Sequence, residues 1–212
     1  MSISVTYYSL IVAFLVSLLL SLQKLDNNLL NITRLLAVML IASGFFYQKH
    51  MDYLKNNNNP DYKYINQTRY NDYFVTYPMI LLILYLILCN TTKQSINNLT
   101  VIGIFLVNMF IVFASYLNKT EKMTKNMSVF WQVILFLVLL GLYYKQFGFN
   151  HKNTVLLLTY VYLVTIGKLQ IIGRLIFKTD QGKSNYLNFI DLLSKSVMGI
   201  VLCGLIFYKK LN

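Results

Sequence analysis

Long apolar runs separated by short polar stretches dominate this sequence of 212 residues. Seven such runs can be drawn, each about the twenty residues that an α-helix needs to cross a bilayer. They lie near residues 4–22, 29–50, 70–90, 98–117, 128–147, 154–175 and 186–208. Because they use nearly the whole chain, the pattern predicts an all-α membrane protein. We expect a single seven-helix transmembrane domain over residues 1–212, without a soluble module.

Two polar stretches between the runs are predicted to be long loops. Residues 51–68, which include NNNNP, form the longer one, and residues 174–185 precede the last run. Pro78 lies inside the third run, where it removes one backbone hydrogen bond, so we expect a kink there.

Composition supports a membrane location. Hydrophobic residues make up 57% of the chain and charged residues 12%, whereas soluble domains carry about a quarter charged residues. The net charge of +12 does not indicate nucleic acid, because the Lys and Arg residues are scattered over loops without a basic stripe. Loop solvation and anionic lipid headgroups account for them better. Lysines are divided almost evenly between the loops on the two sides, so charge bias gives no orientation.

Two carboxylates and two cations lie deep in the predicted spans. Arg69, Asp72 and Thr76 follow one another at steps of three and four, so they share one helix face. Asp191 and Lys195 lie four apart in the seventh run. A carboxylate in a bilayer-length helix costs at least ~2.5 kcal/mol, so we expect the two helices to pair their charges. Salt bridges that only fix helix packing are the alternative, although intramembrane charges usually mark function.

Lys195 also suggests a chemistry. A lysine amine among apolar residues is a good nucleophile toward an aldehyde, and the product is a Schiff base. The protonated Schiff base needs a counter-ion, which Asp72 and Asp191 can provide. Aromatic side chains would flank a long apolar ligand, although each one taken singly is more often plain core: Tyr73, Tyr77, Trp131, Tyr160 and Tyr162.

Two motifs resemble the microbial (type 1) rhodopsins. RYNDYFVTYP, residues 69–78, resembles their third helix, where Arg, Asp, Thr and Pro occur in this order and at these steps. DLLSK, residues 191–195, resembles their seventh-helix Asp-x-x-x-Lys, whose lysine carries retinal. With the seven spans, the resemblance covers the whole topology and implies all-trans retinal as cofactor. The Asn, Lys, Ile and Tyr bias resembles rhodopsins of large DNA viruses of algae and protists.

The resemblance implies a role for each charged residue. Lys195 would form the retinal Schiff base, with Asp72 as primary counter-ion and proton acceptor and Asp191 as second counter-ion. Arg69 would be the gate, and Thr76 the hydroxyl partner of Asp72. The family topology, with the N-terminus outside and the C-terminus cytoplasmic, is adopted from the resemblance alone.

The resemblance also implies a retinal pocket. Trp131 matches a ring-packing tryptophan of the fifth helix, Tyr160 a sixth-helix tyrosine that contacts Asp191, and Tyr47 a second-helix tyrosine. Three further positions complete the expected pocket: Tyr73, Tyr77 and Leu157.

Several positions depart from the family pattern. Ile83 occupies the place of the cytoplasmic proton donor, so the Schiff base should recover its proton slowly. The external glutamates of proton release have no counterpart, since Leu169 and Lys183 fall near their places. Tyr73 and Leu157 replace large tryptophans, and the second replacement should loosen the coupling between retinal and the sixth helix.

These observations predict a retinal-binding photoreceptor that moves ions across a membrane in response to light. The missing donor and release group favour a light-gated cation channel. A conducting path needs polar lining, which five side chains of the first, second and seventh runs can supply: Ser9, Ser43, Gln48, Asn188 and Ser194. For any one serine, a hydrogen bond to its own helix is the plainer interpretation.

Other functions stay open. A slow outward proton pump is the alternative, since Arg69, Asp72 and Lys195 suffice for acceptor chemistry. A sensory photoreceptor ranks last because nothing like a transducer is present, and Asp72 disfavours chloride pumping. We expect no enzymatic activity, no metal site and no nucleic-acid partner. The expected partners are the lipid bilayer and the transported protons or monovalent cations, and a homo-oligomer stays open.

Overall fold

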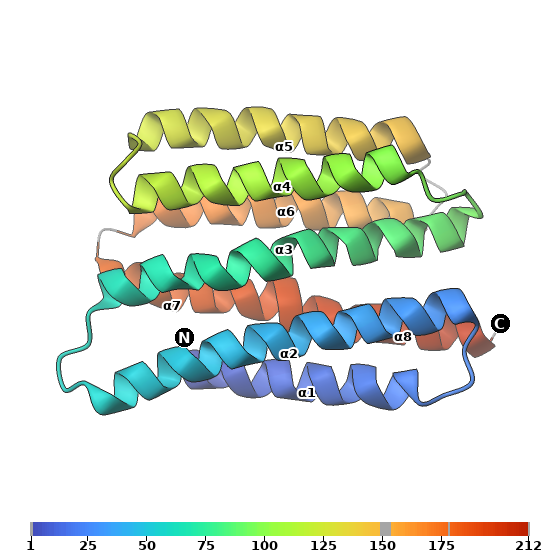
Figure 1. Cartoon of the computed structure of the whole chain (residues 1–212), viewed down its shortest axis with the longest axis horizontal. Helices are drawn as coiled ribbons and strands as arrows, with labels where there is room; N and C mark the ends of the chain where they lie inside the picture. Colours follow the sequence, from blue (N-terminus) through green and yellow to red (C-terminus); the bar gives the residue numbers. More distant parts are fainter. Residues whose placement is uncertain (1, 149–153, 178, 212) are drawn as a thin grey trace. The chain divides into compact units, whose positions relative to one another are not determined.

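The computed structural model describes residues 2–148, 154–177 and 179–211, which are helical almost throughout and contain no strand. The helices are α1 (Ile3–Ser21), α2 (Asn27–Asn56), α3 (Tyr62–Thr92), α4 (Asn98–Lys119), α5 (Lys125–Phe147) and α6 (Thr154–Ile176) (Figure 1). The last part comprises α7 (Asp180–Asp191), a π-helical stretch η1 (Leu192–Val197) and α8 (Met198–Leu211). These three follow one another without a break, and we call them the seventh segment.

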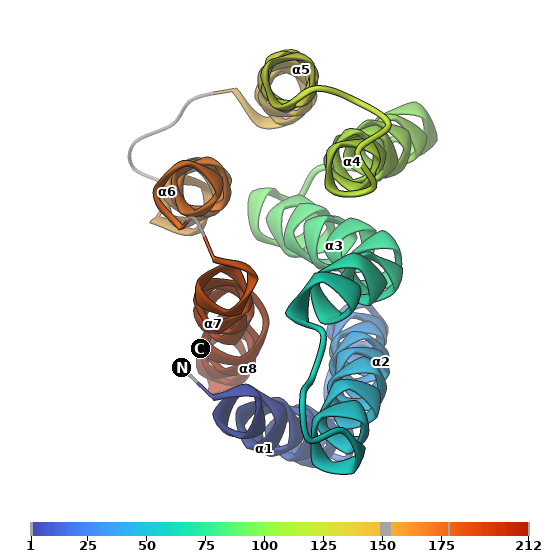
Figure 2. The same cartoon turned by 90° about the vertical axis from the view of Figure 1, so that its left-hand side faces the viewer.

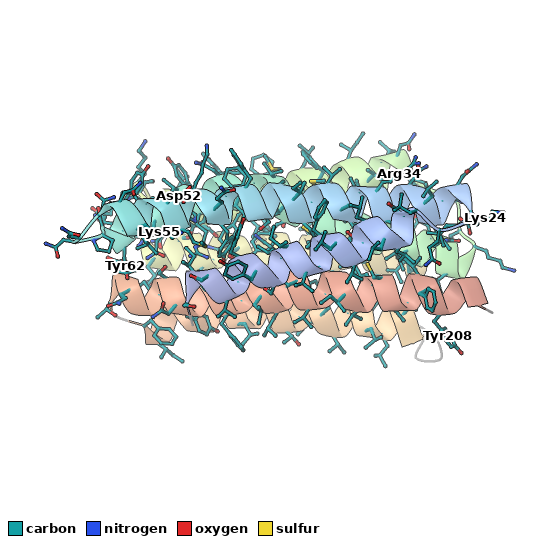
Figure 3. All side chains as sticks on the ribbon, turned by 90° about the horizontal axis from the view of Figure 1, so that it is seen from below. Lys24, Arg34, Asp52, Lys55, Tyr62 and Tyr208 are labelled. Carbon is teal, nitrogen blue, oxygen red and sulfur yellow. The ribbon has the colours of Figure 1, made fainter. Side chains whose placement is uncertain are left out.

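The helices have the length and composition of membrane spans. In the described residues, six stretches are long and apolar enough to cross a bilayer, namely α1 to α5 and the seventh segment. Helix α6 contributes a shorter apolar stretch, Val155–Ile166. Polar side chains lie toward the helix ends: Figure 3 places Lys24, Arg34 and Tyr208 near one end and Asp52, Lys55 and Tyr62 near the other. The chain is an integral, multi-pass membrane protein, as the sequence predicted.

The prediction of a long loop over residues 51–68 is wrong. Helix α2 continues to Asn56 and α3 already begins at Tyr62. Met51 is buried, so tertiary packing holds the last turns of α2 in helical form. The Asp61 carboxylate accepts hydrogen bonds from the backbone N–H groups of Lys63, at 2.7 Å, and Tyr64, at 3.3 Å. These bonds satisfy donors that a helix start otherwise leaves unpaired. Both helices therefore extend beyond their apolar stretches.

The second predicted loop, over residues 174–185, is also wrong. Helix α6 ends at Ile176 and α7 begins at Asp180. The side chain of Thr179 accepts a hydrogen bond from the Gly182 N–H at 3.1 Å, which caps α7. A hydropathy pattern predicts the end of a span where polar residues begin, but a helix with a capped end can include those polar residues.

The described chain forms two compact units. Unit 1 comprises Met1–Thr76 and Ile172–Asn212, and unit 2 comprises Tyr77–Ile171. The expectation of a single domain over residues 1–212 is not tested by this division and stays a prediction.

Unit 1 is built around α1. This helix packs against α2 and along the whole seventh segment, and Figure 2 shows α1 and α2 side by side. Gly199 of α8 permits a close contact. A Cβ atom added there would lie 3.4 Å from Leu40 Cδ1 on α2 and 3.8 Å from Ala13 Cβ on α1.

Unit 2 has an aromatic core. The Tyr143 hydroxyl on α5 donates to the Leu81 carbonyl on α3 at 2.7 Å. The ring of Tyr85 lies 5.5 Å from that of Phe147, centroid to centroid. The Tyr85 hydroxyl accepts a hydrogen bond from the Asn97 N–H, which ties the α3–α4 connection to the core.

The Gly199 contact gives a test of the packing in unit 1. Gly199→Leu should lower stability by about 1–3 kcal/mol, because the larger side chain overlaps Leu40 and Ala13. Gly204→Leu is the matched control on the same helix, since a Cβ added at Gly204 meets nothing within 4 Å. Thermal unfolding in detergent measures both variants. Equal melting temperatures for the two would contradict the packing described.

Candidate functional site

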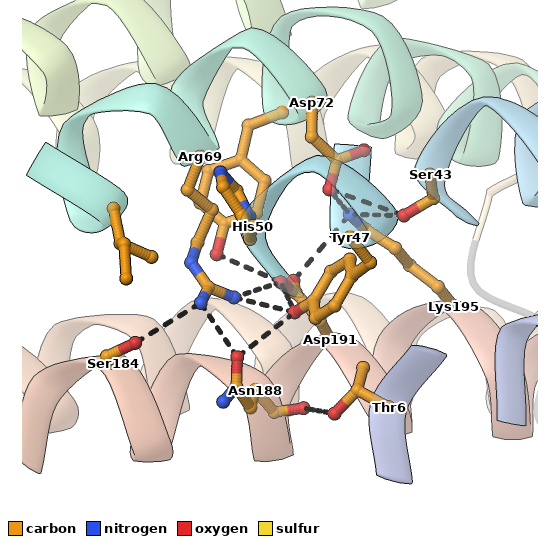
Figure 4. Close-up of polar contacts among 12 residues, drawn as sticks. Thr6, Ser43, Tyr47, His50, Arg69, Asp72, Ser184, Asn188, Asp191 and Lys195 are labelled. Carbon is orange, nitrogen blue, oxygen red and sulfur yellow. Dashed lines mark hydrogen bonds and ion pairs between the residues drawn. The ribbon is translucent and has the colours of Figure 1, made fainter. Parts of the chain in front are cut away.

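Four charged side chains meet inside unit 1 (Figure 4). Lys195 Nζ lies 2.5 Å from Asp72 Oδ2 and 3.7 Å from Asp191 Oδ1. Arg69 Nη1 lies 3.0 Å from Asp191 Oδ2. All four side chains are fully or almost fully buried. Two cations and two carboxylates give a neutral cluster, which is how ionised groups persist in a low-dielectric interior.

Backbone geometry explains why these residues meet. Arg69 and Asp72 lie three apart in α3 and so project from one face. In the seventh segment, Asp191 is the last residue of α7 and Lys195 lies within η1. A π-helical turn bonds residue i to i+5 and is wider than an α turn. It places three consecutive side chains, Ser194, Lys195 and Ser196, in buried positions.

Ser43 of α2 completes the surroundings of Lys195. Its hydroxyl donates to Asp72 Oδ2 at 3.3 Å and accepts a hydrogen bond from Lys195 Nζ at 3.2 Å. Ser43 Oγ, Lys195 Nζ and Asp72 Oδ2 therefore form the three corners of a hydrogen-bonded triangle. The second oxygen, Asp72 Oδ1, is buried without a hydrogen-bond partner.

Asp191 is held differently from Asp72. Its Oδ2 accepts hydrogen bonds from the Tyr47 hydroxyl at 2.6 Å, from Arg69 at 3.0 Å and from the Tyr73 hydroxyl at 3.2 Å. Three donors therefore converge on one oxygen and fix its position. The two carboxylates of the cluster are thus unequal, and Asp191 is the more firmly fixed.

Arg69 is anchored at several atoms. Nη1 donates to the Tyr47 hydroxyl at 2.6 Å, and Nη2 donates to Asn188 Oδ1 at 2.7 Å and to Ser184 Oγ at 3.5 Å. The guanidinium carbon also lies 5.3 Å from the centroid of the Tyr47 ring, within cation–π range. Its Nε has no partner. Arg69 thereby joins α2, α3 and the seventh segment.

Hydroxyl groups join α1 to the same region. The Thr6 hydroxyl donates to the Asn188 carbonyl at 3.1 Å, and Ser9 Oγ lies 3.0 Å from Ser196 Oγ. Ser196 follows Lys195 directly, so α1 contacts the residue next to the central amine.

The structure places the predicted site residues unevenly. It brings together Arg69, Asp72, Asp191, Lys195, Tyr47, Tyr73, Ser43 and Asn188 through the contacts above, and Ser194 is buried beside Lys195. The Thr76 hydroxyl donates to the backbone carbonyl of Asp72 at 2.9 Å. Gln48 is exposed, and its expected place in an ion path stays a prediction. It follows Tyr47, which faces inward, and so lies about 100° further around the helix.

The remaining pocket residues belong to unit 2. Tyr77 is buried, whereas Trp131 and Leu157 are 43% and 40% exposed, so the chain covers these two side chains only in part. The Tyr160 hydroxyl donates to the Gly148 carbonyl at 3.3 Å. Their roles around retinal, and the expected contact of Tyr160 with Asp191, stay predictions. No cluster of three or more His, Cys, Asp or Glu in the described residues could hold a metal.

Sequence reasoning missed four contributors: Thr6, His50, Ser184 and Ser196. Ser184 had a signal, because it lies four residues before Asn188 and so shares its helix face. Ser196 adjoins Lys195, but only the wide turn of η1 buries both. Thr6 and His50 had no signal, since their partners lie on other helices.

Comparison with known proteins gives the fold. No protein-family model and no curated protein matches the chain. The solved structure of viral rhodopsin OLPVRII is similar, with a TM-score of 0.82 and 22% identity over 99% of this chain and 97% of that one. Blue light-absorbing proteorhodopsin from Med12 has a TM-score of 0.69 and 13% identity over 98% of both chains. Exiguobacterium sibiricum rhodopsin has a TM-score of 0.68 and 14% identity over 96% of this chain and 95% of that one.

The chain therefore has the seven-helix fold of the microbial (type 1) rhodopsins. The likeness to the viral rhodopsin extends over nearly the full length of both chains. The recognition made from the third-helix and seventh-helix motifs is confirmed at the level of the fold.

The Tyr47 hydroxyl offers a test of the cluster. Tyr47→Phe should lower stability by about 1–3 kcal/mol, because Asp191 loses a donor and Arg69 an acceptor in a buried place. Tyr8→Phe is the control, since Tyr8 is 62% exposed and should change stability by no more than about 0.5 kcal/mol. Denaturant or thermal unfolding in detergent compares them. A Tyr47→Phe variant as stable as the control would contradict the bonding described.

Proposed function

We propose that this chain binds all-trans retinal through Lys195 and moves ions across the membrane in response to light. One observation carries the proposal: a buried lysine amine lies 2.5 Å from one carboxylate and 3.7 Å from a second. The similarity of the fold to solved structures of three rhodopsins supports the same conclusion.

The residues around Lys195 fit a retinal Schiff base. The amine is buried, and Asp72 and Asp191 can neutralise a positive nitrogen there. Retinal, when bound, supplies the absorption of visible light and a change of shape. The side chains of the protein must then hold the charge of the nitrogen, accept its proton and pass that proton on.

The inequality of the two carboxylates assigns their roles. Asp191 accepts three hydrogen bonds at one oxygen, which leave that oxygen no free position for a proton. Asp72 has an oxygen without a partner, so it can take a proton at Oδ1 while Oδ2 keeps its contact with Lys195. Asp72 is therefore the proton acceptor and primary counter-ion, and Asp191 the second counter-ion. Arg69 is the gate, because it links Asp191 to Asn188 and Ser184 on the far side from Lys195.

For the mode of transport we favour a light-gated cation channel. Polar side chains of α1, α2 and the seventh segment converge on Lys195 through the Ser9–Ser196, Thr6–Asn188 and Ser43–Lys195 bonds. Such bonds close a path while they are intact, and a displacement at Lys195 acts directly on the Ser43–Lys195 bond and, through the next residue, on the Ser9–Ser196 bond. A channel that carries protons or monovalent cations needs this kind of polar constriction.

A slow outward proton pump is the second candidate. The 2.5 Å contact between Lys195 and Asp72 favours it, because direct transfer to the acceptor needs no continuous pore. Ile83, at the expected place of a proton donor, is fully buried. An apolar side chain there makes recovery of the proton depend on water and therefore slow.

Removing the amine tests retinal binding. Lys195→Ala should abolish the visible absorption band that forms when retinal is added to the purified protein, because no other group at this place can form the bond. Lys49→Ala, which removes an exposed lysine of α2, should keep the band. A visible band retained by Lys195→Ala would remove retinal attachment at this residue from the account.

Voltage clamp of cells that express the protein separates the two modes. A channel gives a photocurrent that reverses sign when the cation gradient is reversed, whereas a pump gives an outward current at all moderate voltages. We expect reversal. A photocurrent that stays outward under every gradient would overturn the channel in favour of the pump.

A further inference from the structure

His50 is a buried titratable side chain that the proposed function does not use. It lies on α2, three residues after Tyr47, and is 5% exposed. The two rings are 6.2 Å apart, centroid to centroid. Figure 4 shows His50 beside Arg69, near the part of the cluster that Arg69 and Tyr47 form. His50 therefore adjoins the charged cluster on its Arg69 side.

The hydrogen bonds of Thr68 fix the tautomer of His50. Thr68 Oγ1 donates its single hydrogen to a backbone carbonyl of its own helix, that of Tyr64 at 3.0 Å or Ile65 at 3.2 Å. The same oxygen lies 3.0 Å from His50 Nε2 and, while its hydrogen is given to one of these carbonyls, accepts a hydrogen bond there. A neutral His50 thus carries its proton on Nε2. Its Nδ1 has a free lone pair, and this nitrogen is buried without a partner.

Other buried polar atoms without hydrogen-bond partners lie along α3, beginning at Asp72, which contacts Lys195. Asp72 Oδ1, Arg69 Nε and Asn66 Oδ1 are buried without partners. These three residues follow one another at steps of three along α3, so they lie on one face. The Asn66 amide donates to the Asp180 carbonyl at 2.9 Å, at the beginning of α7. Polar atoms of this kind are those that bound water satisfies inside proteins.

We propose that His50 is a proton relay between the charged cluster and the end of unit 1 formed by the α2–α3 loop. The proton held on Asp72 Oδ1 breaks its O–H bond there, passes through bound water and forms an N–H bond at His50 Nδ1. The imidazolium then loses its Nε2 proton to water at the half-buried Thr68, and exchange at the ring restores the starting tautomer. The relay rests on the proposed function and is compatible with either mode of transport.

Charged and titratable groups surround His50. Tyr47 faces the imidazole from α2, Arg69 from α3, and Asp191 and Lys195 from the seventh segment. The cationic Arg69 and Lys195 oppose a positive imidazole, whereas Asp191 favours it. These charges couple the imidazole to the state of the cluster.

Time-resolved proton release tests the relay. The full chain with retinal is placed in detergent with a pH-sensitive dye, and the dye signal is followed after a light flash. His50→Gln keeps an amide N–H that can donate to Thr68 but has no titratable nitrogen. It should release its proton on the order of a hundredfold more slowly than the wild type, as expected for loss of a positioned proton carrier. Lys49→Gln changes an exposed residue next to His50 on α2, keeps the imidazole and should release its proton at the wild-type rate.

A second readout does not depend on light. The chain contains two histidines, so ¹⁵N-histidine NMR of the dark protein gives two ring systems, and His50→Gln identifies one of them. The His50 ring should be neutral and protonated at Nε2. A ring protonated at Nδ1, an unchanged release rate in His50→Gln, or equal slowing in Lys49→Gln would each overturn the relay. A wild type that forms no visible band would instead defeat the proposed function.

Discussion

Compensation of charge inside an apolar interior is the constraint on which this structure depends. Asp72 and Asp191 can remain ionised among membrane-spanning helices only because Lys195 and Arg69 lie against them. Removing any one of the four would leave a buried charge without its partner, which is far more costly than removing a pair. The requirement fixes which faces of α3 and the seventh segment turn toward each other. It also explains why so many neutral donors gather around the cluster, since charged atoms still need hydrogen bonds when water is excluded.

The neutral side chains divide the cluster into two halves with different properties. Around Asp191, the bonds from Tyr47, Tyr73 and Arg69 converge on one oxygen and hold it rigidly. Around Asp72, the triangle with Lys195 and Ser43 leaves the second oxygen unbonded. A change at the Lys195 nitrogen therefore reaches Asp72 first, while Asp191 and Arg69 keep the surrounding helices in place. The proposed relay at His50 lies beyond the rigid half and extends the same polar route along α3.

The sequence predicted the part of this arrangement that follows from spacing within one helix. Arg69 with Asp72, and Asp191 with Lys195, were identified by their steps of three and four, and the apolar runs located the spans. What depended on other helices was not predictable. Helix ends were missed because burial of Met51 and capping by Asp61 and Thr179 extend α2, α3 and α7 past their apolar stretches. The exposure of Gln48 was not predictable either, because hydropathy does not give the rotation of a helix. The bond of His50 to Thr68 joins residues on separate helices.

The π-helical stretch η1 has a consequence for the seventh segment as a whole. Because a wider turn contains one residue more than an α turn, everything after it is rotated by about 100° relative to a continuous α-helix. The portion before η1 presents Asn188 and Asp191 to Arg69, and the portion after it presents Gly199 to Leu40 and Ala13. A regular α-helix of the same sequence could satisfy one of these neighbourhoods but not both. The π-helical turn thus lets the part before it face Arg69 and the part after it face Leu40 and Ala13, and Lys195 lies within this turn.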